Sequence, residues 1–152
     1  MPHRLAHAEA SVPPDDSQIF IVSGEPDPPC FGWEEQRFLY CARDVVVLQS
    51  GSQWLHEARV RLEAWDSHPP APEGNWGESQ GGRLLLSDET VAVQALYEID
   101  LSDRIRVGEP GWYEVRAYVA GREELRRWEQ EWNGEDDHPV GLEQFLVQLW
   151  PA

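Results

Sequence analysis

The chain has 152 residues, of which 41% are hydrophobic, so it is long enough to bury a core and too apolar for an intrinsically disordered protein. Its 28 acidic residues outnumber 12 basic ones, all of them arginine, and the formal charge of −16 argues against direct binding to nucleic acid phosphates. No segment reaches the roughly 20 apolar residues that span a bilayer, and the first residues lack the apolar core of a secretory signal. We therefore expect a cytoplasmic protein that does not enter a membrane.

The first third of the chain predicts two strands and a helix. Residues 1–15 are polar and contain three prolines, which predicts a mobile leader. A strand follows over Ser17–Ser23, and the prolines after Gly24 end it. Phe31–Arg43 has weak helical spacing, so we expect a short helix packed on a sheet, followed by a Val-rich strand over Asp44–Gln49.

The clearest strand pattern covers Trp54–Trp65. Charged residues occupy one face, and the opposite face is predicted to point into a core, with His56 as a hydrogen-bonded core histidine. This buried face comprises His56, Ala58, Val60, Leu62 and Ala64. A loop over Asp66–Gln80 then leads to predicted strands at Arg83–Ser87 and Glu89–Tyr97.

Two strands flank a polar insertion near the end of the chain. The strands cover Pro110–Arg122 and Glu143–Pro151, and the insertion covers Glu123–Val140. With about seven or eight strands and one or two short helices, we predict one domain over residues 16–152 that folds as an all-β, antiparallel β-sandwich.

Sequence motifs of enzymes and cofactor sites are absent. The chain has no Gly-x-Ser-x-Gly, Walker-type or Cys-x-x-Cys pattern, and Cys30 and Cys41 match no metal-ligand spacing, which predicts free thiols. Asp136 and His138 could hold a cation, but their neighbours lack the alternating spacing of a calcium loop. We therefore predict no catalytic residues, no metal and no cofactor.

The insertion is the candidate binding site. Leu125, Trp128 and Trp132 are spaced along one side of a short helix. One interpretation is that this helix folds its tryptophans back onto the sandwich; the other is an aromatic anchor with an acidic rim that faces a basic protein. On the second interpretation the partner-binding residues are Trp128, Trp132, Glu129, Glu131, Glu135, Asp136 and Asp137.

The spacing of the strands resembles that of the competence protein J family, whose members inhibit a DNA-entry nuclease. The similar segments are Asp16–Val22, the Trp33 region leading to Val45, Trp54–Trp65, Gly111–Arg116 and Phe145–Pro151. The resemblance covers most of residues 16–151 and implies a β-sandwich without catalytic residues.

Together these features predict an acidic binding protein. The first hypothesis is an inhibitor or immunity protein whose carboxylates and tryptophans occlude a basic nuclease or toxin. The alternative is a non-catalytic adaptor or regulatory subunit of a bacterial multiprotein assembly, in which the charge only keeps the protein soluble. A sugar-binding or hydrolytic sandwich is a third class, because exposed tryptophans can stack on sugar rings.

Overall fold

The computed structural model describes residues 1–26, 31–53, 56–95, 99–134 and 138–152. This part of the chain forms eleven strands and one helix. In chain order they are β1 (Arg4–Val12), β2 (Gln18–Val22), β3 (Leu39–Ala42), β4 (Val45–Gln49), β5 (Glu57–Trp65), β6 (Glu78–Leu86), β7 (Thr90–Ala95), β8 (Ile99–Asp100), β9 (Ile105–Arg106), β10 (Gly111–Ala120), α1 (Arg122–Glu131) and β11 (Val140–Pro151). The all-β class with a short helix is confirmed, whereas the count of seven or eight strands was too low.

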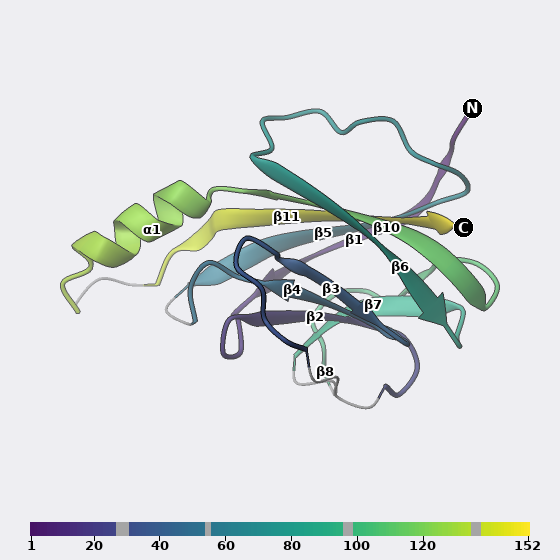
Figure 1. Cartoon of the computed structure of the whole chain (residues 1–152), viewed down its shortest axis with the longest axis horizontal. Helices are drawn as coiled ribbons and strands as arrows, with labels where there is room; N and C mark the ends of the chain where they lie inside the picture. The colour runs from purple at the N-terminus through teal and green to yellow at the C-terminus, as the bar shows by residue number, and fades with distance from the viewer. Residues whose placement is uncertain (27–30, 54–55, 96–98, 135–137) are drawn as a thin grey trace.

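The strands form two sheets (Figure 1). The first sheet has the order β1-β5-β11-β10-β6, and the second has the order β3-β4-β2-β7-β8, with β9 also pairing with β7. All pairs are antiparallel except β5 with β11, which is parallel. The prediction of a wholly antiparallel fold was therefore wrong at this pair, whose strands are joined by the long crossover that a parallel pair needs.

Both sheets contribute to one large buried cluster. In β10 and β11 every second residue points into it, as the pleat of a strand requires: Tyr113, Val115 and Ala117 are buried, and so are Phe145 and Val147. The predicted inner face of β5 is confirmed, since its apolar residues and His56 are all buried.

Two predictions in the first third of the chain were wrong. Residues 1–15 are not a mobile leader, because β1 pairs antiparallel with β5 along most of its length and buries Ala8, Ala10 and Val12. The domain boundary drawn at residue 16 therefore cuts through the first sheet. Phe31–Arg43 does not form a helix either; its last part is β3, whose Leu39 and Tyr40 are both buried.

Among the described residues, no helix is long and apolar enough to cross a membrane. Cys41 forms no disulfide, and burial raises the pKa of its thiol to about 11, although the Arg37 charge acts in the opposite direction. Cys30, the other predicted free thiol, lies outside the described residues.

Candidate functional site

Helix α1 occupies the connection between the paired strands β10 and β11 and lies beyond the sheets, at the opposite end of the molecule from both chain termini (Figure 1). The predicted helix in the insertion is confirmed. It begins at Arg122, after Gly121 adopts a left-handed conformation with φ of 83°. A Cβ atom at position 121 would lie only 1.7 Å from the carbonyl oxygen of Leu142 in β11, so glycine permits this close approach of helix and strand.

One apolar side chain and one ion pair attach α1 to the sheets. Leu125 is 1% exposed. The Arg122 side chain, at the first position of the helix, lies 3.4 Å from the Glu143 carboxylate in β11 and donates a hydrogen bond to the carbonyl of Gln49 at the end of β4. Its guanidinium also lies 5.3 Å from the centre of the Phe38 ring, a cation–π contact. Arg122 therefore joins the helix to strands of both sheets.

Glu143 is the centre of a buried polar network. The Ser50 hydroxyl donates to Oε1 of Glu143 at 2.7 Å, and the Gly51 N–H donates to Oε2 at 2.7 Å. Nε2 of His56 lies 2.9 Å from the Ser50 oxygen. Where the single Ser50 proton goes to Glu143, an Nε2–H tautomer of His56 donates to the Ser50 oxygen. The predicted hydrogen-bonded core histidine is thus confirmed.

The network has titratable groups with shifted pKa values. Burial raises the pKa of Glu143, and hydrogen bonds from Ser50 and Gly51 together with the Arg122 charge oppose that shift. Burial lowers the pKa of His56. Ser50, His56 and Glu143 are the residue types of a catalytic triad, but here the serine lies between the other two and all three are buried. The arrangement fits a structural role that holds α1 against the strands.

The tryptophans of the candidate site are half-buried and lie together. Trp128 is in the last turns of α1, and Trp132 is the first residue after the helix, where the backbone is extended. The centres of their rings are 6.2 Å apart at an interplanar angle of 37°. Both side chains are thus partly covered by the protein, and contact of their exposed parts with a partner stays a prediction.

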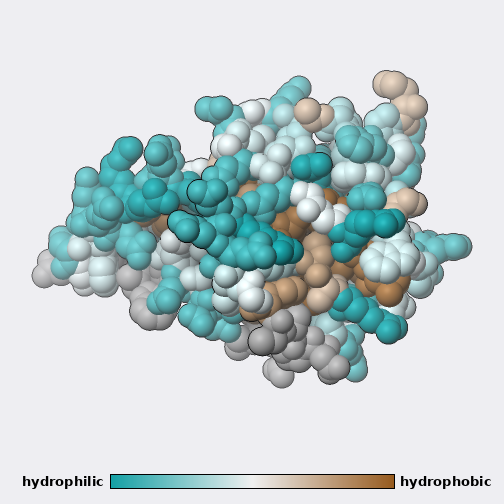
Figure 2. All heavy atoms as spheres, in the orientation of Figure 1, coloured by the Kyte–Doolittle hydropathy of each residue, from teal (hydrophilic) through white to brown (hydrophobic). Residues whose placement is uncertain are grey.

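The surface of α1 is hydrophilic (Figure 2). Glu129 and Glu131 are exposed, and so are Arg126 and Arg127. The exposed surface of the helix therefore carries both signs of charge, whereas the prediction was an acidic rim. The other predicted partner-binding residues, Glu135, Asp136 and Asp137, lie outside the described residues. Within the described part of the chain, no group of three or more histidine, cysteine or acidic side chains could hold a metal ion.

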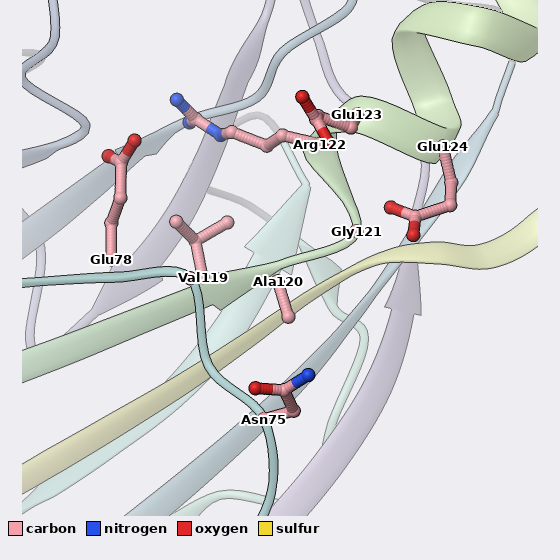
Figure 3. Close-up of a pocket in the computed structure, with 9 residues that line it drawn as sticks. Asn75, Glu78, Val119, Ala120, Gly121, Arg122, Glu123 and Glu124 are labelled. Atoms are coloured by element: carbon pink, nitrogen blue, oxygen red, sulfur yellow. The ribbon is translucent and has the colours of Figure 1, made fainter.

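Beside the N-terminal turn of α1 lies an open groove of about 430 Å³ (Figure 3). It is lined by Asn75 and Glu78 on one side and by residues 119–124 on the other. Glu78, Glu123 and Glu124 carry carboxylates there, so the groove continues the negative charge of the helix onto the neighbouring edge strand β6.

Sequence reasoning missed the network around Glu143. The signal was present, because Glu143 begins the alternating series Glu143, Phe145, Val147 and Leu149 and therefore points inward with the apolar residues. A charged residue at an inward position of a strand predicts a buried partner. The sequence separation between Ser50, Arg122 and Glu143 gave no indication of which partner it would be.

No protein-family model and no curated protein matches the chain in sequence. Two solved structures are similar to it. The first is ComJ from Bacillus subtilis, described as an inhibitor of the DNA degrading activity of NucA, with a TM-score of 0.60 and 10% identity over 100% of this chain and 99% of ComJ. This chain shares the fold of ComJ.

The second similar structure is the protein described as crocagin biosynthetic gene J, with a TM-score of 0.59 and 18% identity over 99% of this chain and 98% of that protein. The resemblance to the competence protein J family is thereby confirmed for the fold. One similar protein is described as a nuclease inhibitor, and the other is described by a biosynthetic gene. The fold by itself therefore does not specify a function.

Proposed function

We propose that this chain is a cytoplasmic, non-catalytic β-sandwich protein that binds and inhibits a basic nuclease or toxin, and that α1 and the residues after it make the contact. The similarity to ComJ supports an inhibitor at the level of the fold. The formal charge of −16 would speed the approach of a basic partner.

The observation that carries the proposal is the charge at the end of α1. Glu123 and Glu124 lie in the first turn, where negative charge is favourable, but Glu129 and Glu131 lie near the C-terminal end, which has no basic residue in its last turn. The helix dipole makes acids unfavourable there by about 0.3–1 kcal/mol each. Among the described residues neither glutamate forms an ion pair. Glu129 and Glu131 therefore lower the stability of the free protein, and they lie beside the partly exposed indoles of Trp128 and Trp132. A basic partner would supply the positive charge that these two carboxylates lack.

The test combines capture and inhibition. The purified chain is used as bait at low salt, bound protein is released by a salt step, and the nuclease activity of the released protein is measured with and without added bait. We expect a basic protein whose DNA degradation the bait suppresses and whose binding weakens steeply with salt. Recovery of nothing that the bait inhibits would remove the support for this function.

Two sets of variants locate the contact. Trp128→Ala with Trp132→Ala should abolish binding, whereas Trp112→Ala, an exposed tryptophan in β10, should not change it. Glu129→Gln with Glu131→Gln should weaken binding and slightly raise the free energy of unfolding of the free protein. Binding that survives all four substitutions at α1 would place the contact elsewhere.

A second candidate function is that of a non-catalytic adaptor or regulatory subunit in a bacterial multiprotein assembly. The similarity to crocagin biosynthetic gene J favours it, because that protein's description names a biosynthetic role. An adaptor interface should survive high salt, and its partner should have no nuclease activity, so the salt step and the activity assay separate the two functions.

A further inference from the structure

A pocket of about 210 Å³ lies on the outer face of the first sheet, away from α1. Its floor is formed by side chains of the neighbouring strands β10 and β11, and its other side by the loop between β5 and β6, which arches over the sheet (Figure 1). The floor includes Arg116, Tyr118, Gln148 and Trp150, and the loop contributes His68 and Pro69.

In the part of the chain that the structure describes, the charge of Arg116 has no partner. Among the described residues its guanidinium forms no ion pair and no hydrogen bond. The carboxylates nearest in the strand registers are already paired: Glu114 lies 3.4 Å from Arg83, and Glu63 lies 2.8 Å from Arg61. In a chain with more than two acids for each arginine, the unpaired guanidinium of a half-buried arginine in a pocket is available to an external anion.

The strand neighbours of Arg116 define the space around its guanidinium. Its partner in β6 is Gly81, where a Cβ atom would lie 3.3 Å from the guanidinium carbon, so the charged group packs against bare backbone. Its partner in β11 is Gln148, whose amide donates to the buried Glu63 carboxylate at 3.1 Å and is therefore fixed. The guanidinium therefore packs on the backbone of β6, and its N–H groups remain available to a carboxylate.

Aromatic rings flank the charge. The His68 and Trp150 rings meet edge to face with centres 4.8 Å apart, and Tyr118 lies beside Arg116 on the same face of β10. The pocket volume equals that of about seven water molecules in the liquid, which suits a phenyl ring with a short acidic arm. A few polar groups in an aromatic pocket are the usual composition of a small-ligand site.

We propose that this pocket binds a carboxylate carried on a small, flat apolar group. Arg116 pairs with the carboxylate through its guanidinium, and Trp150, His68 and Tyr118 pack against the apolar group. The carboxylate belongs either to a small organic acid or to the C-terminus of a peptide that ends in an aromatic residue. The site shares no residue with α1, so it does not depend on the function proposed above.

Isothermal titration with hydrocinnamate, a phenyl ring on a short chain with a carboxylate, tests the proposal directly. The neutral amide of the same acid is the matched ligand control. Salt at about 0.15 M reduces the Debye length to about 8 Å, which limits general repulsion of anions by the acidic protein. We expect saturable binding of the acid at millimolar concentration or better and at least about tenfold weaker binding of the amide, because hydrogen bonds to a charged group are the stronger kind.

A pair of arginine variants assigns the effect to the pocket. Arg116→Gln should weaken binding of hydrocinnamate about tenfold or more. Arg59→Gln is the control, because Arg59 is exposed on β5 in the same sheet and does not line the pocket. Thermal melts establish that both variants are folded; if Arg116→Gln is not, the acid-to-amide ratio of the unchanged protein still decides the question.

A short peptide ending in phenylalanine, with a free or an amidated C-terminus, distinguishes the two sources of the carboxylate. Tighter binding of the free peptide than of hydrocinnamate assigns the pocket to peptide C-termini, and the reverse order assigns it to small acids. The proposal is overturned if no acid binds, if acid and amide bind equally, or if Arg59→Gln has the same effect as Arg116→Gln. Saturable binding of methyl glucoside in place of the acids would overturn it in favour of a sugar site.

Discussion

Replacement of Gly121 by alanine tests the attachment of α1 to the sheet. The added Cβ atom would lie 1.7 Å from the Leu142 carbonyl oxygen and 2.8 Å from its carbonyl carbon. Both atoms are backbone, so no side-chain rotation relieves the overlap. The first residues of α1 must therefore move away from β11, which strains the contacts of Arg122 and Leu125.

Two effects add to the cost of this substitution. Alanine at a φ of 83° pays roughly 1–2 kcal/mol for the left-handed conformation. Insertion of a methyl group into a space already occupied adds about 1–3 kcal/mol. The free energy of unfolding should therefore fall by about 2–5 kcal/mol in total, which lowers the melting temperature by roughly 2–4 °C for each kcal/mol.

Gly141 supplies the matched control, because its φ is 81° and a Cβ atom there would meet none of the described residues within 4 Å. Urea denaturation of Gly121→Ala and Gly141→Ala measures both costs, and the difference between them isolates the close approach to Leu142. Limited trypsin digestion after Arg126 and Arg127 reports on loosening of α1 and should accelerate only in Gly121→Ala. Equal destabilisation and equal digestion of the two variants would refute the packing described for the β10–α1 junction.

Three further predictions concern buried groups. Leu125→Ala should lower the free energy of unfolding by about 2–5 kcal/mol, whereas Leu5→Ala, at a side chain 56% exposed, should change it by less than about 0.5 kcal/mol; equal effects would contradict the docking of α1. His56 has a lowered pKa when folded, so its contribution to stability is complete above the unfolded value of 6.5 and is lost as pH falls below it, by up to about 1.4 kcal/mol for each pH unit. The difference in the free energy of unfolding between the unchanged protein and His56→Gln should therefore shrink as pH falls from 7.5 to 5.5. An equal difference at the two pH values would contradict the burial of a neutral imidazole. In a Cys30→Ser background, iodoacetamide should modify Cys41 slowly at pH 8 and faster as pH approaches its pKa of about 11; rapid modification at pH 8 would show that the thiol is not protected by burial.

Local sequence pattern determined the strands with a strict period of two and the helix in the insertion. In β5, charged and apolar residues alternate from Glu57 to Ala64, and the apolar face is buried as the pattern predicts. On the charged face Glu63 is buried as well, where Arg61 and Gln148 contact its carboxylate. The helical spacing of Leu125 and Trp128 likewise predicted α1, because apolar residues along one side of a segment are enough to indicate a helix. The pattern of spaced strands also sufficed for the family resemblance at the level of the fold.

Strands with weaker sequence patterns form because they pair with neighbouring strands. β1 alternates only small alanines with polar residues, which is a weak signal, and its pairing with β5 makes it a strand. The apolar residues of Phe31–Arg43 do not alternate, so this segment indicates a helix by its sequence alone. In the structure Leu39 and Tyr40 of β3 are buried on opposite faces and in different clusters, which explains the missing alternation.

The sequence by itself determined that this protein is acidic, mainly β, and equipped with a helix near its C-terminus that carries Trp128 and is followed by Trp132. The tertiary structure alone decided which distant residues meet: Ser50, Arg122 and Glu143 at the base of α1, and Arg116 with Trp150 and His68 on the outer face of the first sheet. Periodicity reports the direction in which a side chain points relative to its own strand. The identity of the side chain it meets depends on strand order, and that order follows from burying all the apolar faces at once.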